Sequence, residues 1–352
     1  MHATRSLTAI AAFFATVNAA NAGGHAIGAV RAGTPQWMQM RLHGLLHGMP
    51  SPRAEAPTSE TAPSQTPSLT FTFLDYPGTS YTNLETINLG ASAHAKQYGV
   101  GVYGPALAGA GNYAGFLITL TAPKGAMSET YTPVLPNESS VFPVGVNDHG
   151  EIVGFLGQDE SSTGFLLKNG VVTSIIAPYP DVQNTSANGI TNNGTIVGGY
   201  QTSNDSQYGF TWKNGTYTQV PPYPGASQTW PWSINNKGDQ SGYVTDSAGN
   251  THGFLLVNGA YTLLDYPGAG YTIAIALNDL DQVVGFYCMT AAECGGNEES
   301  LNGFLYANGT YTALNVPGIT YNVPSGINNS GVIAGSYIDT NGFWHSYMAT
   351  QQ

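Results

Sequence analysis

The chain has 352 residues, only 9% of them are charged, and its formal net charge is −12. From residue 69 onward it contains no Arg and only five Lys: Lys96, Lys124, Lys168, Lys213 and Lys237. A protein that grips nucleic acid needs several phosphate-neutralising cations on one face, so nucleic acid and anionic membrane surfaces are excluded as partners.

The first 22 residues are predicted to be a signal peptide. Arg5 gives a positive start, an apolar run covers 7–17, and small residues for cleavage follow. The run is too short to span a membrane. The alternative is a disordered Ala-rich tail.

Residues 23–68 are predicted to be a disordered linker, because 50–68 is rich in Pro, Ser and Thr. A short amphipathic helix over 36–47 is the one element that this segment could form. The folded domain is predicted to cover 69–352.

A repeat with a period near 45 residues fills this domain. Its clearest marker is a Gly-aromatic step, which occurs as Gly115-Phe116, Gly164-Phe165, Gly209-Phe210, Gly253-Phe254, Gly303-Phe304 and, in altered form, Ser346-Tyr347. A repeat of this length is a supersecondary unit that buries its apolar face against its neighbours.

Each repeat carries two hairpin signals, which predict four strands, named A to D in chain order. An Asn-rich turn joins strands A and B, as in Thr191-Asn192-Asn193-Gly194, and Asn-Gly joins strands C and D, as in Asn258-Gly259. Asn and Gly tolerate the positive φ that a type I′ turn requires. Four-stranded units of this period are typical of propeller blades.

The ends of the repeat favour a closed ring over an open solenoid. The last repeat stops after strand C, whereas a lone D-like strand, Phe71 to Leu74, precedes the first repeat. We therefore predict an all-β fold, a six-bladed β-propeller of four-stranded blades, with the last blade closed by the N-terminal strand at 70–76. The strand beginning at Phe71 should pair with the one containing Trp344.

The two cysteines, Cys288 and Cys294, lie in an insertion between strands B and C of the fifth repeat. In an exported domain this spacing favours a disulfide. A metal site would require further soft or imidazole ligands, and the sequence predicts none. No cofactor motif occurs either, so no cofactor is predicted.

The repeats resemble the HAF-repeat family of bacterial extracellular repeat proteins, which is named for a His-Ala-Phe-like step. Here the step survives as His252-Gly253-Phe254 and more distantly as His345-Ser346-Tyr347. The resemblance covers the repeat region and implies a secreted or cell-surface β-propeller-like protein. It supplies no catalytic residues.

Aromatic residues that depart from the repeat give the clearest functional signal. Trp230 and Trp232 are two positions apart, which places both indoles on one side of a strand. With Tyr271 and Tyr321 they are the predicted ligand-binding residues. The D-to-A connections are centred on Tyr-Pro-Gly, or on Tyr-Pro-Asp at Tyr179. Their tyrosines are Tyr76, Tyr179, Tyr223 and Tyr266, with Val316 as the exception, and these Tyr are interpreted as packing between blades.

The favoured function is a non-catalytic binding or structural module that engages a glycan or another surface protein. The alternative is a secreted carbohydrate-active hydrolase or lyase that uses loop acids such as Asp205, Asp246 or Asp339. A third alternative is a coat protein without a ligand. The sequence predicts no catalytic residue and leaves the oligomeric state open.

Overall fold

Every regular element in the described part of the chain is a β-strand. The computed structural model describes residues 69–79, 81–90, 97–104, 114–121, 128–138, 140–157, 162–204, 206–289, 301–316, 318–319, 321–341 and 343–351. The predicted signal peptide, the linker and the helix at 36–47 lie outside these ranges.

The strands form four-stranded antiparallel groups that follow the predicted A-B-C-D order. Group 1 contains β2 (Tyr81–Ile87), β3 (Gln97–Gly104), β4 (Ala114–Thr121) and β5 (Ser128–Val134). Group 2 contains β6 (Val141–Val146), β7 (Ile152–Leu156), β8 (Thr163–Lys168) and β9 (Val171–Ile175). Group 3 contains β10 (Val182–Ile190), β11 (Ile196–Thr202), β12 (Gln207–Lys213) and β13 (Thr216–Gln219).

The second half of the chain repeats the pattern. Group 4 contains β14 (Gln228–Ile234), β15 (Gln240–Thr245), β16 (Thr251–Val257) and β17 (Ala260–Leu264). Group 5 contains β18 (Tyr271–Leu277), β19 (Val283–Cys288), β20 (Asn302–Ala307) and β21 (Thr310–Leu314). Group 6 contains β22 (Asn322–Ile327), β23 (Ile333–Ile338), β24 (Trp344–Gln351) and, from the other end of the domain, β1 (Leu69–Leu74).

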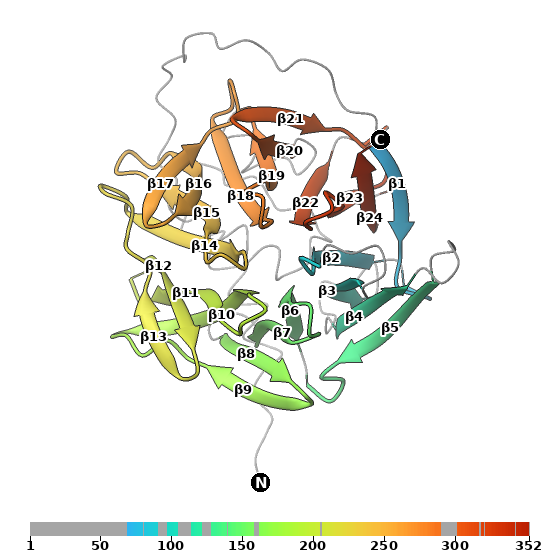
Figure 1. The fold of residues 1–352 in the computed structure, drawn as a ribbon, viewed down its shortest axis with the longest axis horizontal. Helices are drawn as coiled ribbons and strands as arrows, with labels where there is room; N and C mark the ends of the chain where they lie inside the picture. Colours follow the sequence, from blue (N-terminus) through green and yellow to red (C-terminus); the bar gives the residue numbers. More distant parts are fainter. Residues whose placement is uncertain are drawn as a thin grey trace, which may run out of the picture.

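The groups are arranged around a common centre, with their A strands innermost (Figure 1). β1 pairs antiparallel with β24 in an unbroken register from Leu69↔Gln351 to Leu74↔Ser346. The strand at Phe71 therefore lies beside the strand that contains Trp344, as the sequence analysis predicted. This pairing supplies group 6 with its outermost strand.

In the Gly-aromatic step, the aromatic ring is buried and the glycine allows the backbone of the neighbouring group to approach closely. Phe254 is fully buried inside group 4. A Cβ atom on Gly253 would lie 2.9 Å from the carbonyl oxygen of Leu264 and 3.2 Å from the amide nitrogen of Ala274, on the A strand of the next group. Glycine is required here because the neighbouring backbone approaches so closely.

The Asn-Gly turns between strands C and D have the predicted geometry. Both central residues have positive φ, for example 50° at Asn258 and 79° at Gly259. Asn169, Asn214 and Asn308 adopt the same conformation. These angles are those of a type I′ turn, whose twist matches that of the flanking strands.

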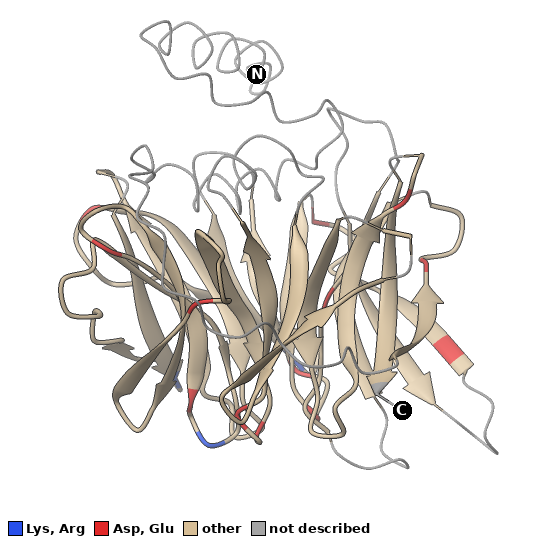
Figure 2. Cartoon of the chain, turned by 90° about the horizontal axis from the view of Figure 1, so that it is seen from above, with Lys and Arg blue, Asp and Glu red and all other residues tan. Residues whose placement is uncertain are grey.

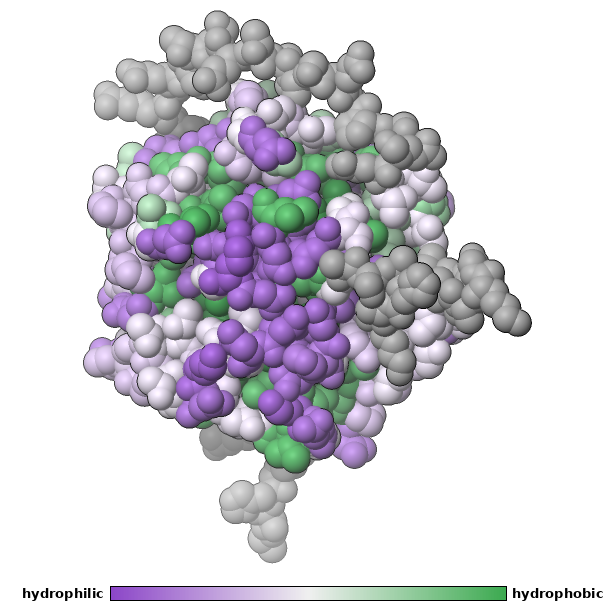
Figure 3. Space-filling view, in the orientation of Figure 1, coloured by the Kyte–Doolittle hydropathy of each residue, from purple (hydrophilic) through white to green (hydrophobic). Residues whose placement is uncertain are grey.

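The turns between strands A and B are linked from one group to the next. The amide of Asp148 donates to Asn192 Oδ1 at 3.0 Å, and the amide of Asn192 donates to Asn236 Oδ1 at 2.8 Å. The same step joins Asn236 to Asp279 and Asp279 to Asn329. Hydrophilic side chains accordingly gather near the centre of this face (Figure 3). We call these linked residues the turn belt.

Between groups 6 and 1 the turn belt has a different hydrogen bond. There Leu89 takes the place of the Asn or Asp, and only its carbonyl oxygen accepts from the amide of Asn329, at 3.2 Å. Hydroxyl groups link the two groups instead. Ser325 Oγ donates to the carbonyl oxygen of Leu84 at 2.6 Å, and Ser346 Oγ accepts from the amide of Leu84 at 2.8 Å.

Candidate binding site at the inner strands

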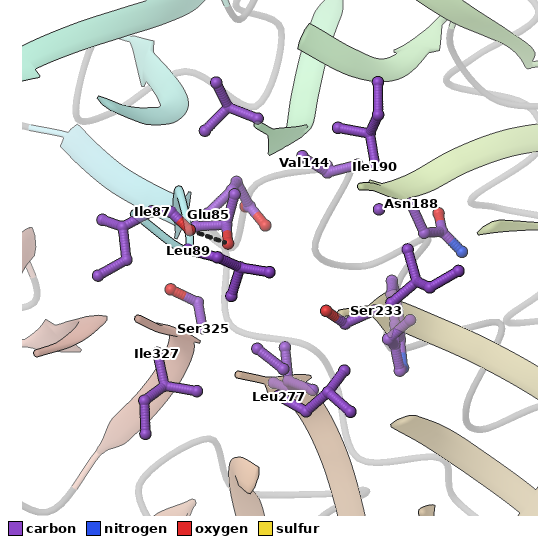
Figure 4. Close-up of a pocket in the computed structure, with 18 residues that line it drawn as sticks. Glu85, Ile87, Leu89, Val144, Asn188, Ile190, Ser233, Leu277, Ser325 and Ile327 are labelled. Atoms are coloured by element: carbon purple, nitrogen blue, oxygen red, sulfur yellow. Dashed lines mark hydrogen bonds between the residues drawn. The ribbon is translucent and has the colours of Figure 1, made fainter. Parts of the chain in front are cut away.

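Every A strand carries a β-bulge at the same place. In β18 the ladder register skips Ile275 between Ala274 and Ala276, and in β14 it skips Trp232 between Pro231 and Ser233. The bulged residues of the inner strands are Glu85, Val144, Asn188, Trp232, Ile275 and Ser325. A bulge re-aims the extra side chain. All of these residues line one central cavity (Figure 4).

The central cavity has a volume of about 40 Å³. A cavity needs only about 10–15 Å³ of such volume to hold one water molecule, so this one has room for a few waters. Its polar lining includes Glu85, Asn188, Ser233 and Ser325. Glu85 is 3% exposed, and its Oε1 accepts a 2.6 Å hydrogen bond from Asn83 Nδ2.

An aromatic cluster lies toward the ends of the inner strands that carry the D-to-A connections. It brings together residues that are far apart in the sequence: Tyr81, Phe142, Phe155, Tyr243, Tyr271, Phe286, Tyr321 and Trp344, with Trp230 and Trp232 packed against them. All four predicted ligand-binding residues therefore belong to one cluster.

Trp230 and Trp232 are only partly buried and contact each other, with ring centroids 6.3 Å apart and ring planes at 70°. They differ in what else they touch. Trp230 lies flat on Gly199 of group 3, where a Cβ atom would be 2.6 Å from its ring, whereas Trp232 occupies the bulge and lines the cavity. The two-residue spacing predicted one common side, and the bulge separates their surroundings.

Tyr271 and Tyr321 are buried, at 3% and 2% exposed. Burial raises the pKa of Tyr271 well above its usual value, and the nearby Tyr243 adds to this shift. The Tyr321 ring meets Trp344 edge to face at 5.1 Å. Both tyrosines are thus buried members of the cluster, whereas the two tryptophans are partly exposed. Ligand binding by all four residues stays a prediction.

The Tyr residues of the Tyr-Pro-Gly connections pack between groups, as interpreted from the sequence. Tyr266 stacks on Tyr287 of the following group at 3.6 Å and 4°. Tyr76 stacks on Tyr103 in the same way, at 3.7 Å and 2°. Trp212, which replaces a repeated Leu, is 9% exposed and belongs to the core.

Two of the aspartates that the alternative function, a hydrolase or lyase, would use are close to histidines. His252 Nδ1 lies 2.8 Å from Asp265 Oδ1, and its Nε2 lies 3.6 Å from Asp246 Oδ2. Group 6 repeats this arrangement with His345, which lies 2.9 Å from Asp75 and 3.6 Å from Asp339. Each histidine thus ties a B-to-C loop to the end of a D strand. Asp205 lies outside the described residues.

The His252 cluster predicts a pH-dependent contribution to stability. The hydrogen bond to Asp265 raises the pKa of His252 above its usual 6.5, against an opposing effect of burial, and Asp246 adds to the rise. A raised pKa in the folded state means that the stabilisation is fully present below about pH 6.5 and is lost as the pH rises through the raised value.

We expect a His252→Asn variant to be less stable than the wild type at about pH 5.5, and this difference to shrink by about pH 9. Asn302 occupies the equivalent position in group 5, so asparagine suits this backbone. Urea denaturation of both proteins across this range measures the effect. A difference that does not change with pH would contradict the assignment.

Cys288 is fully buried at the end of β19, and none of the described cysteines is free. Cys294 lies outside the described residues, so the predicted disulfide stays a prediction. Within the described ranges no group of three or more His, Cys, Asp or Glu could hold a metal ion. The same residues include no helix of the length and hydropathy needed to cross a membrane.

Charges are distributed unequally over the two faces. The lysines of the described residues lie near the face of the A-to-B and C-to-D turns, where Lys237 Nζ is 2.6 Å from Asp281 and Lys168 Nζ is 2.7 Å from Glu151 (Figure 2). The opposite face carries the paired carboxylates of Asp75, Asp246, Asp265 and Asp339. Among described residues this second face has no Lys or Arg.

No family model and no curated protein matches the chain. Solved structures with similar architecture share little sequence with it. A fucose-specific lectin from Aleuria aurantia is 10% identical, with 81% of this chain and 93% of that chain covered and a TM-score of 0.47. A gluconolactonase from Xanthomonas campestris is 11% identical, with 84% and 99% covered and a TM-score of 0.43. The β-propeller domain of the trilobed protease from Pyrococcus furiosus is 6% identical, with 78% and 96% covered and a TM-score of 0.42. At these values the comparisons assign the chain to no family.

Proposed function

We propose that the chain is a secreted or cell-surface six-bladed β-propeller that acts as a non-catalytic binding module. Its ligand would be an uncharged glycan or another surface protein, bound over the aromatic cluster. The predicted export signal at 1–22 and the resemblance to HAF-repeat proteins support the location outside the cell.

The blade count and the closure of the ring rest on the strand pairings. Each proposed blade corresponds to one four-stranded group, and the last blade takes β1 as its outermost strand. A parallel bridge between Tyr81 and Trp344 also joins groups 1 and 6. A closed ring leaves no long unpaired edge between its ends, which favours a single stable domain.

The observation that carries the function is the position of Trp230 and Trp232. Both aromatic side chains depart from the repeat, and both remain partly exposed against an otherwise buried aromatic cluster. Indole rings supply large, flat apolar surfaces with one polar group. The nearby charges are carboxylates, so the surface suits a neutral ligand better than an anionic one.

Trp232 provides the decisive test. We expect the wild type to bind a subset of neutral glycans on an array, and Trp232→Ile to weaken this binding by about tenfold or more, since a stacked aromatic contact contributes about 0.5–1.5 kcal/mol beyond its buried area. Ile275 occupies the same bulge in group 5, so isoleucine is compatible with the backbone.

Trp212→Phe is the matched control, because Trp212 lies in the core away from the aromatic cluster. It should leave glycan binding unchanged. Equal binding by wild type and Trp232→Ile, with both proteins folded by circular dichroism, would refute the proposed site.

A further inference from the structure

A second pocket lies between groups 1 and 2, which are neighbours around the centre of the molecule (Figure 1). Its volume is about 280 Å³, against about 40 Å³ for the central cavity. Its walls include Leu117 and Thr132 of group 1 and His149, Glu151 and Leu167 of group 2, and we call it the side pocket. Ligand pockets in proteins start at about 300 Å³, so the side pocket suits a small molecule.

The apolar walls of the side pocket are aliphatic. Val134 and Ile152 are each 3% exposed, and Leu117 and Leu167 pack, partly buried, against the same hydrophobic cluster. None of the described residues that line the pocket has a benzene or indole ring. A flat ligand would find no such ring to stack on, so these walls suit an alkyl chain.

One wall of the side pocket carries a buried carboxylate that is already paired. Glu151 is 8% exposed, its Oε1 lies 2.7 Å from Lys168 Nζ, and its Oε2 accepts from Asn147 Nδ2 at 2.7 Å. Burial acts to raise the pKa of Glu151, but the hydrogen bonds from Lys168 and Asn147 outweigh it and lower the pKa. Both oxygens of an ionised carboxylate are thus in use, so Glu151 holds Lys168 in place instead of offering a site to a cation.

Lys168 and His149 offer hydrogen-bond donors to an anion at the same wall. The side chain of Lys168 is 54% exposed, and an ammonium group has three N–H donors, of which the contact with Glu151 occupies one. His149 is exposed and close enough for its charge to lower the pKa of Glu151. The donors that remain at this wall therefore favour a negatively charged group.

The net charge of −12 does not prevent the binding of one anion at this place. At about 0.15 M salt the Debye length is about 8 Å, so exposed charges farther away are largely screened. Asp148, which adjoins His149, accepts hydrogen bonds from Asn88 and Asn192. The local balance is set by the two donors of the side pocket and by the carboxylate that is already paired.

His149 is found in only one of the A-to-B turns. The equivalent residues, whose amides also donate to the first Asn of their turn, are Lys237, Leu280 and Ser330. Group 3 has Asn193 at this place. The turn therefore forms with several residue types, so its geometry does not account for the imidazole beside the side pocket.

We propose that the side pocket binds a medium-chain aliphatic monocarboxylate, with hexanoate as its representative. The alkyl chain lies against Leu117, Ile152 and Leu167. The carboxylate of the ligand accepts hydrogen bonds from Lys168 Nζ and from the imidazole N–H of His149. This site is separate from the aromatic cluster and does not depend on glycan binding there.

The charge preference is tested by ligand-observed NMR titration of the full chain at about 0.15 M salt. Hexanoate, hexanol and hexylammonium share one alkyl chain and carry a negative, no and a positive charge. Hexanoate should bind about tenfold or more tighter than hexanol, because hydrogen bonds to a charged group are the stronger ones. Hexylammonium should bind most weakly. Absence of saturable hexanoate binding, or tighter binding of hexylammonium, would overturn the proposal.

Butanoate and pentanoate test the aliphatic walls. Each methylene removed from hexanoate should weaken binding about threefold to fourfold, as expected when one methylene fewer is buried. An affinity that does not change with chain length would mean that only the carboxylate is bound, at the surface, and would refute the pocket.

Thr132→Trp is the decisive variant, because Thr132 is exposed at the wall of the side pocket and an indole there would occupy the space. It should weaken hexanoate binding about tenfold or more. Thr218→Trp is the matched control, since Thr218 pairs with Thr211 in group 3 as Thr132 pairs with Leu117 in group 1. The control should bind hexanoate like the wild type. Unchanged affinity in a folded Thr132→Trp protein would rule out this site.

Two substitutions of His149 test its role as a donor. His149→Ser introduces the residue type of Ser330 and should weaken hexanoate binding about fivefold or more, whereas His149→Lys introduces the residue type of Lys237 and should preserve it. Equal binding by His149→Ser and the wild type would contradict the contact with the imidazole. Trp232→Ile should leave hexanoate binding intact, so failure of the glycan site and failure of the side pocket are distinguishable.

Discussion

A Gly285→Ala variant should lose about 3 kcal/mol or more of its free energy of unfolding. The bulge in β18 brings the carbonyl oxygen of Ile273 over Gly285, and an added Cβ would lie 1.9 Å from that oxygen. This oxygen belongs to the backbone, so it cannot rotate away from the added Cβ as a side chain could. The single methyl group would therefore have to straighten the bulge and displace Ile275 from the central cavity.

Urea denaturation followed by circular dichroism measures this loss. Gly259→Asn is the matched control, since Gly259 lies in a turn at φ 79° with nothing within 4 Å of an added Cβ, and asparagine tolerates this conformation. The control substitution should lower the free energy of unfolding by less than about 1 kcal/mol. Equal losses in the two variants would mean that the bulge is not rigid.

An Asn278→Ala variant should lose about 2–4 kcal/mol of its free energy of unfolding, because it removes a side chain that makes four hydrogen bonds in the A-to-B turns. Asn278 is fully buried. Its Oδ1 accepts from the amides of Leu280 and Gln282, and its Nδ2 donates to Gln282 at 2.7 Å and to the carbonyl oxygen of Asn328 at 3.0 Å. Alanine would leave the buried carbonyl oxygen of Asn328 and the partly buried groups of Gln282 without these partners.

Asn328→Ala provides the comparison within the same set of turns. Asn328 is equally buried, but its Nδ2 has no hydrogen-bond partner among the described residues, and its Oδ1 accepts only from Ser330 and Val332. We expect Asn328→Ala to lose less free energy of unfolding than Asn278→Ala, by at least about 1 kcal/mol. Thermal and urea denaturation of both variants give this difference, and the reverse order would show that the links between groups contribute little.

Much of the fold could be predicted from local chemistry. Asn-Gly pairs specify type I′ turns because few residues tolerate positive φ, and the positive φ values of Asn169, Asn214, Asn258 and Asn308 agree. The Asn-rich turns were interpreted as turn chemistry, and Asn147 Oδ1 indeed accepts from the amides of His149 and Glu151.

The candidate sites were predictable only in part. The departure of Trp230, Trp232 and Val316 from the repeat is visible in the sequence. That the indoles join Tyr271 and Tyr321 in one cluster depends on contacts between groups.

By itself the sequence determined the repeat, its strand order, its turn types and the pairing of the first strand with the last. These follow from side-chain periodicity and from the backbone conformations that Asn and Gly permit, both of which are local. The tertiary structure alone decided the bulges of the inner strands, the turn belt, the burial of Tyr271 and Tyr321, and the small size of the central cavity. These features arise where backbones from different repeats meet, and the distance between two such backbones is not encoded in either segment separately.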